Sequence, residues 1–162
     1  MSKISYERLV EVANYCPVTG VFTSKVSRGP LKVGDQIGCI NLNGYWQMCI
    51  DGALHYGHRL AFLWMEGEYP PRLVDHINGD RSDNRWSNLR HATAGVNAQN
   101  QRRPRIDNTS GLLGVSMHAD GKWQARIKVG PNYKSLGLHD TKEAAHAAYV
   151  AAKKLHHEGN TL

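Results

Sequence analysis

The chain has 162 residues, of which 41% are hydrophobic and 21% are charged, and its formal net charge is +6 at pH 7. This length suits one compact body with a small additional module, and no apolar run reaches the ~18 residues that a membrane helix needs. The positive balance favours a polyanionic partner, although a soluble basic protein without one can carry the same charge. The unpaired cysteines and the lack of a signal-peptide pattern predict a reducing cytoplasm.

The first 70 residues contain short apolar segments separated by Gly and Pro. The predicted elements are strands at residues 20–26, 36–42 and 45–50 and a helix at residues 56–66. This region either helps to grip a nucleic acid or is the scaffold on which the next segment packs. His55 and His58 suggest a zinc site, but the three cysteines form no Cys-x-x-Cys pair, so a structural zinc ribbon has too few ligands.

A strand, a loop, a second strand and a helix are predicted between about residues 72 and 104. The first strand spans residues 72–77, the loop 78–88, the second strand 89–91 and the helix 94–103. Thr93 is the expected N-cap of this helix, and Pro104 is expected to end it.

The first strand and the helix of this unit carry side chains suited to metal-assisted cleavage of a phosphodiester. Asp75 and Asn97 offer oxygen ligands for a hard divalent cation, and His76 can take a proton from water near neutral pH. Neighbouring strand residues point to opposite faces, so Asp75 and His76 can serve one phosphate only where the strand twists, bulges or ends. Other polar loop residues are typical turn formers and are excluded from the metal ligands: Asn78, Asp80, Asp83 and Asn84.

This segment resembles the HNH endonucleases of the ββα-metal type, in the branch that includes phage homing enzymes. The resemblance rests on the order and spacing of Asp75, His76, Asn88, Arg90 and Asn97. The resemblance implies that Asp75 and Asn97 hold a single Mg²⁺ or Mn²⁺ ion and that His76 is the general base. It also implies that Asn88 ties the loop and orients the base, and we expect Arg90 to contact DNA. Many members have a second His where this chain has Asn97, so we expect modest, Mg²⁺-like metal affinity.

The segment after the predicted helix is basic and rich in residues that end regular structure. Residues 71–162 carry the whole excess of positive charge, because cationic and acidic side chains balance in residues 1–70. We therefore expect the basic segment after the helix, residues 101–105 and 108–111, to lie along a phosphate backbone, with Arg102, Arg103 and Arg105 as DNA contacts. It also marks the expected boundary between a domain of residues 1–105 and a domain of residues 106–162.

The C-terminal residues predict three antiparallel strands. Apolar and polar side chains alternate over residues 121–129, so Trp123 and Ile127 are expected to face a core while Arg126 and Lys128 face outward. Turn signals at residues 119–121 and 130–132 supply the two connections.

A helix is predicted over residues 140–158. Asp140 is the expected N-cap, Glu143 completes a capping box, and Gly159 stands at the C-terminal cap position. The small residues of the apolar face allow close approach to a sheet. That face is predicted to consist of Ala145, Ala148, Tyr149, Ala152 and Leu155.

The strands and helix together resemble the plant ethylene-response-factor DNA-binding domain over about residues 111–160. The residues that carry this resemblance are Gly114-Val115, Gly121-Lys122-Trp123, Leu136-Gly137, Asp140-Thr141, Glu143-Ala144-Ala145 and Ala148-Tyr149. That family lays its three-stranded sheet in the major groove. The DNA contacts implied here are Ser116, His118, Arg126, Lys128, Tyr133 and Ser135. Several contact positions that carry Arg or Trp in that family carry smaller residues here, including Ser116 and Ser135. We therefore do not expect this chain to recognise the DNA sequence that the plant family recognises.

The sequence therefore predicts an α+β protein in which a ββα-metal nuclease unit with small N-terminal antiparallel strands precedes a three-stranded sheet packed on one helix. The predicted function is a divalent-metal-dependent endonuclease of double-stranded DNA, with no membrane and no obligate protein partner evident. The rival hypothesis is a DNA-binding regulator whose nuclease unit is inert. For a phage-derived enzyme, the cytoplasm would be that of a bacterial host.

Overall fold

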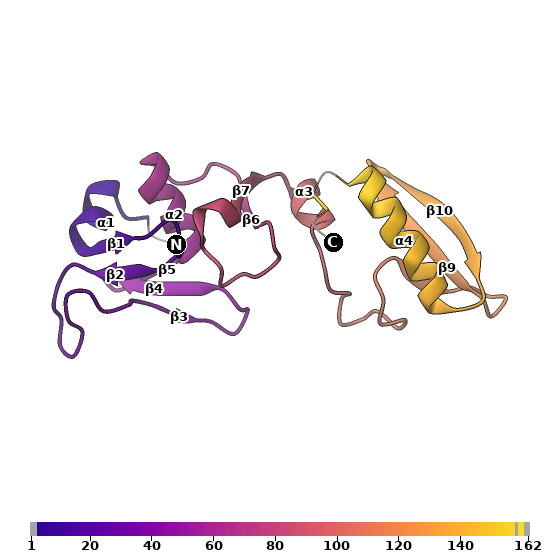
Figure 1. The fold of residues 1–162 in the computed structure, drawn as a ribbon, viewed down its shortest axis with the longest axis horizontal. Helices are drawn as coiled ribbons and strands as arrows, with labels where there is room; N and C mark the ends of the chain where they lie inside the picture. The colour runs from indigo at the N-terminus through magenta and orange to yellow at the C-terminus, as the bar shows by residue number, and fades with distance from the viewer. Residues whose placement is uncertain (1–2, 158, 161–162) are drawn as a thin grey trace. The chain divides into compact units, whose positions relative to one another are not determined.

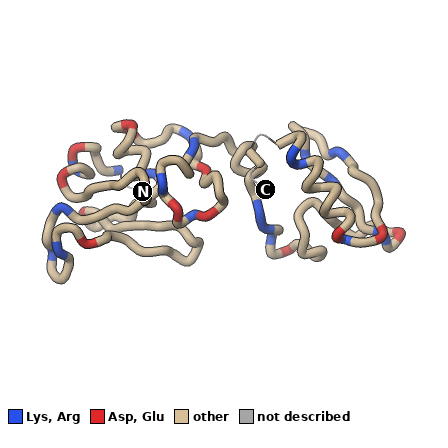
Figure 2. The backbone as a smooth tube through the Cα atoms, viewed as in Figure 1, with Lys and Arg blue, Asp and Glu red and all other residues tan. Residues whose placement is uncertain are grey.

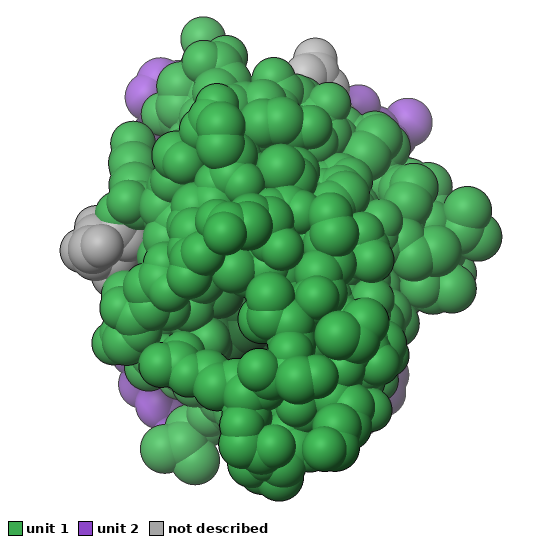
Figure 3. Space-filling view, turned by 90° about the vertical axis from the view of Figure 1, so that its left-hand side faces the viewer, with its two compact units in different colours: residues 1–93 green, residues 94–162 purple. Residues whose placement is uncertain are grey.

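A computed structural model describes residues 3–157 and 159–160 of the chain. The chain forms two compact units, Met1–Thr93 and Ala94–Leu162, which are described separately below (Figures 1 and 3). Both units combine helices with small antiparallel sheets, which confirms the predicted α+β class. Among the described residues, no helix is long and apolar enough to cross a membrane.

Unit 1 consists of three small antiparallel sheets and two α-helices. Its elements are α1 (Tyr6–Val12), β1 (Ala13–Tyr15), β2 (Phe22–Ser24), β3 (Cys39–Ile40), β4 (Trp46–Ile50), β5 (Ala53–Tyr56), α2 (Gly57–Glu66), β6 (Leu73–His76), the 3-10 helix η1 (Trp86–Asn88) and β7 (Leu89–Ala92). The sheets are β1-β2, β3-β4-β5 and β6-β7. The last pair, with the loop between its strands, is the strand-loop-strand unit that the sequence predicts.

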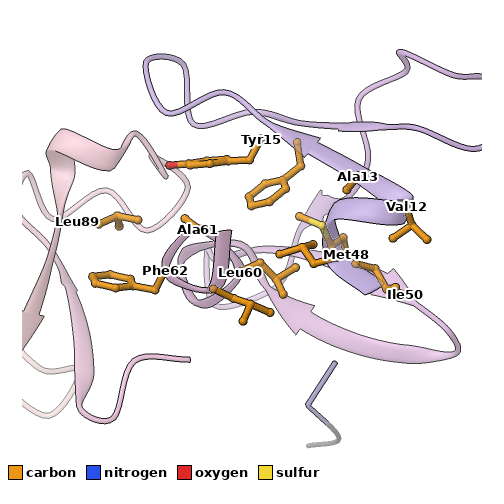
Figure 4. Close-up of a cluster of buried hydrophobic side chains, with 12 residues drawn as sticks. Val12, Ala13, Tyr15, Met48, Ile50, Leu60, Ala61, Phe62 and Leu89 are labelled. Carbon is orange, nitrogen blue, oxygen red and sulfur yellow. The ribbon is translucent and has the colours of Figure 1, made fainter. Parts of the chain in front are cut away.

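The core of unit 1 gathers around α2, as Figure 4 shows. Leu60, Phe62 and their neighbours on α2 are buried against α1, β1 and β4. The Phe62 ring also lies 4.7 Å from the Trp86 ring and 4.5 Å from the His91 ring, measured between centroids. These contacts fix the β6-β7 hairpin against the buried helix.

Unit 1 also contains elements that the sequence prediction did not include. Strand β5 pairs with β4 through a tight turn at Asp51 and Gly52, both of which have positive φ (51° and 78°). Asp-Gly favours such a hairpin turn, so the signal was present in the sequence. Helix α1 has only seven residues and begins at the N-cap Ser5, whose side chain accepts a hydrogen bond from the Arg8 amide. So short a helix gives little periodicity to detect.

Unit 2 contains a three-stranded antiparallel sheet covered on one face by a helix, as predicted. Its elements are α3 (Ala94–Gln99), β8 (Val115–Met117), β9 (Trp123–Val129), β10 (Asn132–His139) and α4 (Lys142–His156), and the strand order is β10-β9-β8. Ala125 and Ile127 of β9 are buried, and Ala125 joins Ala145 of α4 in the core, whereas Arg126 and Lys128 are exposed. The alternation read from the sequence is confirmed.

Both predicted caps of α4 are wrong. Thr141, not Asp140, is the N-cap, because its side chain accepts a hydrogen bond from the Ala144 amide, the donor that a capping hydroxyl reaches. Asp140 instead pairs with Lys122 at 3.2 Å. His157 is the C-cap, because its backbone amide bonds to the Lys153 carbonyl.

The predicted apolar face of α4 is correct at Ala145 and Ala152 but wrong at Leu155, which is 81% exposed. Lys153 takes the buried position, with 1% of its surface exposed. Its Nζ donates to the Gln101 carbonyl at 2.7 Å, which supplies the partner that a buried amine requires.

Helix α3 is shorter than predicted, ending at Gln99 and not at residue 103. Two amides still make helix-like bonds beyond it, from Asn100 to the Val96 carbonyl and from Gln101 to the Ala98 carbonyl. The next carbonyl, that of Gln101, accepts from the Lys153 amine. In a helix that ended at residue 103 this carbonyl would have no intrahelical partner, and here the Lys153 amine supplies one.

Candidate active site and nucleic-acid face

Asp75 and His76 are the last two residues of β6, where they face Arg90 and Leu89 of β7 in antiparallel register. Both side chains belong to buried residues, each with 4% of its surface exposed. The strand ends at His76, and the Gly79 amide bonds back to the His76 carbonyl at 2.8 Å. If both residues serve one phosphate, the strand must twist, bulge or end at these two positions. The structure shows that the strand ends there.

The Asp75 carboxylate forms an ion pair with Arg90. Oδ2 of Asp75 accepts from Nη2 of Arg90 at 2.7 Å and from Nε at 3.0 Å. A buried carboxylate is costly unless it is paired, and the guanidinium opposite supplies the compensating charge. Arg90, which we expected to contact DNA, therefore also neutralises Asp75.

Asn88 ties the two ends of the loop between β6 and β7 together. Its Oδ1 accepts from the Asn78 amide at 2.9 Å, and its Nδ2 donates to the Asp83 carbonyl at 2.8 Å. Its own carbonyl accepts from the Ile77 amide at 2.8 Å. These bonds close the loop directly beyond His76.

The His76 ring is enclosed by side chains from distant parts of unit 1. Its Nε2 lies 3.3 Å from Oδ1 of Asn84, and the centroids of the His58 and Tyr45 rings lie 5.2 Å and 6.1 Å away. Burial lowers the pKa of His76 below its ordinary value of 6.5, while the bond to Asn84 and the nearby carboxylates oppose this shift. The ring therefore favours its neutral form, which a proton acceptor requires.

The aromatic surroundings of His76 were not predicted from the sequence. His58 stacks on Tyr56 at 5.5 Å and lies 5.3 Å from Tyr45, and the Arg81 guanidinium lies 4.9 Å from the centre of the Tyr45 ring. Within the described part of the chain, the buried Nδ1 of His58 has no hydrogen-bond partner. In the sequence, the nearby His55 and His58 suggested a zinc site. They did not indicate that His58 packs against the His76 ring.

The structure places Asn97 on α3, which belongs to unit 2, where the residue is exposed. Its assignment as a metal ligand together with Asp75 stays a prediction. The described residues contain no cluster of three or more His, Cys, Asp or Glu side chains suited to a metal. A carboxylate oxygen and an amide oxygen are donors that suit a hard cation, and in this structure the Asp75 carboxylate is paired with Arg90 instead.

Strand register gathers the DNA contacts predicted in unit 2 on the open face of the sheet. Tyr133 pairs with Lys128 and Ser135 with Arg126 across β10-β9, and Ser116 pairs with Gln124 across β8-β9. Tyr133 is 70% exposed, and its ring centre lies 5.9 Å from the Arg126 guanidinium and 6.0 Å from Nζ of Lys128. Cross-strand neighbours share a face, so these side chains form one basic and aromatic surface.

Other predicted contacts in unit 2 lie outside this sheet face or beside it. His118 lies directly after β8, where its Nδ1 is 3.1 Å from the Asp120 carboxylate. Arg102, Arg103 and Arg105 are exposed in the segment after α3, and Arg105 pairs with Asp107 at 3.2 Å. Figure 2 shows this run of cationic residues along the backbone.

Residues 55–99 match the family model for HNH endonucleases. Among solved structures, that of the HNH homing endonuclease I-HmuI, studied for DNA binding and cleavage, aligns at 27% identity with a TM-score of 0.43. The alignment covers 56% of this chain and 51% of that chain, so the match spans about half the length of each. No curated protein matches the chain.

The family match covers the last two residues of β5, then α2, the β6-β7 hairpin and α3. Over these residues the chain is similar to HNH endonucleases. The match includes Asp75, His76, Asn88 and Asn97, the residues that carry the resemblance in the sequence.

We predict that His58 makes unit 1 less stable in acid. Burial lowers its pKa to about 3, whereas the unfolded chain takes up the proton near 6.5. Between these values the unfolded state binds more protons, so the free energy of unfolding should fall by about 1.4 kcal/mol per pH unit as pH decreases. His58→Phe should remove this contribution and make the pH dependence shallower.

Urea unfolding at several pH values between 6.5 and 4.5, followed by tryptophan fluorescence, measures this slope. His156→Phe is the matched control, because His156 is exposed on α4. Equal slopes for the wild type and His58→Phe would show that His58 does not resist protonation.

Proposed function

We propose that the protein is a divalent-metal-dependent endonuclease that hydrolyses phosphodiester bonds of double-stranded DNA. The observation that carries the proposal is the buried Asp75-His76 pair at the end of β6, within the HNH endonuclease match and closed by the loop that Asn88 ties. A buried ionisable pair is costly, which favours a functional reason for its presence. We further propose the homing class and a phage origin on the family resemblance.

The metal ligands in this proposal are Asp75 and Asn97, and the ion is Mg²⁺ or Mn²⁺. When bound, a single divalent cation would stabilise the charge that develops on the phosphate and on the leaving oxygen. Asp75 supplies negative charge, and Asn97 supplies a neutral carbonyl oxygen, which suits a hard cation of modest affinity. Arg90 offsets the Asp75 charge in the structure, so its contact with Asp75 is expected to adjust when a cation approaches.

His76 is the proposed general base. Its buried ring favours the neutral state, so it can accept a proton from a water molecule placed in line with the scissile phosphate. Attack by that water would give 5′-phosphate and 3′-hydroxyl ends. Asn88 keeps the loop beyond His76 closed through its bonds to Asn78 and Asp83.

The C-terminal sheet and the basic segment before it are proposed to hold the DNA. The basic and aromatic sheet face formed by Ser116, Arg126, Lys128, Tyr133 and Ser135 is supported by strand register, and it agrees with the resemblance to the ethylene-response-factor domain. His118 beside that face and the basic segment at residues 102–105 would add contacts. We propose that residues 1–105 act as the nuclease domain and residues 106–162 as the DNA-binding domain, in the cytoplasm of a bacterial host.

The rival function is a DNA-binding regulator with an inert nuclease unit. Both hypotheses predict DNA binding, but only the first predicts that the site cleaves DNA. The retention of Asp75, His76, Asn88 and Asn97 supports an active enzyme.

We predict that His76→Ala reduces single-turnover DNA cleavage while DNA affinity remains nearly constant. General-base catalysis contributes on the order of 10²–10⁴-fold, and the base need not hold DNA in order to act. The cleavage rate at saturating protein and metal, with a parallel binding titration, measures both quantities. Unchanged cleavage by His76→Ala would exclude His76 as the base.

We also predict that the open sheet face sets the salt dependence of DNA binding. Each phosphate contact contributes about 0.9 to the slope of log affinity against log salt, so replacing Arg126 and Lys128 with Ala should lower the slope by up to about 1.8. The double substitution of Lys142 and Lys154 removes the same charge from the exposed surface of α4 and should leave the slope nearly unchanged. Equal slopes for the wild type and both double variants would show that this face does not bind phosphates.

A further inference from the structure

Asn84 lies in the loop between β6 and β7 and is almost completely buried, with 2% of its surface exposed. Asn is a residue type typical of turns, and the loop around Asn84 is rich in such residues. A turn residue normally faces water, whereas a buried carboxamide requires a hydrogen-bond partner for its polar atoms. The partners of Asn84 therefore indicate why it is buried.

The Asn84 carboxamide has its oxygen toward His76. Its Nδ2 donates to the Ser82 carbonyl at 3.3 Å, and its Oδ1 lies 3.3 Å from Nε2 of His76. A carboxamide oxygen can only accept a hydrogen bond, so the hydrogen between these atoms must belong to the ring nitrogen. The contact therefore requires a proton on Nε2 of His76.

Three segments of unit 1 hold Asn84 in place. The Tyr15 hydroxyl, at the end of β1, donates to the Asn84 carbonyl at 2.6 Å. A Cβ atom added at Gly57, the first residue of α2, would lie 2.8 Å from Nδ2 of Asn84. A Cβ atom added at Gly20 would lie 2.5 Å from the Asn84 carbonyl carbon. The two glycines thus provide the space that Asn84 occupies, and the tyrosine fixes its backbone.

We propose that Asn84 is a positioning residue that holds His76 in the neutral tautomer with the proton on Nε2, so that Nδ1 accepts a proton. In a neutral imidazole one nitrogen donates and the other accepts, and the hydrogen bond made by one determines the role of the other. This inference rests on the proposed role of His76 as general base. It assigns the orientation of the base to Asn84, while Asn88 closes the loop.

The tautomer of wild-type His76 tests the proposal without any substitution at Asn84. Nitrogen-15 NMR at pH 8, with the His76 signals identified by their loss in His76→Gln, should show a protonated Nε2 and an unprotonated Nδ1. The reverse pattern, or fast averaging between the two tautomers, would overturn the proposal. This readout does not depend on cleavage, so it remains informative even if His76→Ala proves fully active.

Two substitutions at Asn84 then separate hydrogen bonding from packing. Asn84→Leu keeps the approximate shape but removes the acceptor, and it should lower single-turnover cleavage by about 10–100-fold, the effect typical of losing a partner that orients a functional histidine. Asn84→Asp keeps an acceptor at the same place and should cleave faster than Asn84→Leu. DNA affinity should be the same in both variants.

Ser82→Ala is the matched control in the same loop. It removes the bond from the Ser82 hydroxyl to Asp80, of length 2.7 Å, but keeps the backbone carbonyl that binds the Asn84 amide. Cleavage by this variant should remain within about twofold of wild type, since its loss is that of one exposed hydrogen bond. Equal losses in Asn84→Leu, Asn84→Asp and Ser82→Ala, or a protonated Nε2 retained in Asn84→Leu, would show that Asn84 acts only in loop structure.

Discussion

Unit 1 buries a carboxylate and an imidazole on consecutive residues at the end of one short strand. Much of the surrounding structure supplies the partners that these two buried groups need. Asp75 needs a positive partner and receives Arg90 from the paired strand β7. His76 needs a hydrogen-bond partner and lies against Asn84. Because unpaired buried charges and polar groups cost several kcal/mol, the hairpin register and the loop conformation are tied to these two residues.

The same constraint explains why residues far apart in the sequence meet at the site. The loop that carries Asn84 is held by Tyr15 and by the space at Gly57, and the hairpin rests on Phe62 of α2 through Trp86 and His91. The small N-terminal sheets and α2 are thus the scaffold that supports the β6-β7 hairpin and its loop in unit 1.

Much of the architecture follows from local sequence signals, and the exceptions have tertiary causes. The strict alternation in β9 predicts both its buried residues and its exposed cations, and the order of Asp75, His76 and Asn88 predicts the hairpin and loop. Asp140 and Thr141 are adjacent and both can cap a helix, so sequence alone does not choose between them. Lys153 is buried only because a carbonyl 52 residues earlier accepts its amine, a partner that no local pattern reveals. The burial of Asn84 likewise depends on neighbours from β1 and α2, which no local pattern reveals.

Cleavage of DNA at this site is tested most directly by the fate of supercoiled plasmid incubated with the full chain in Mg²⁺ or in EDTA. We expect conversion of the supercoiled form to nicked or linear DNA with Mg²⁺ and no conversion with EDTA. Plasmid that stays supercoiled in both Mg²⁺ and Mn²⁺, while the protein demonstrably binds it, would contradict nuclease activity and favour a DNA-binding regulator.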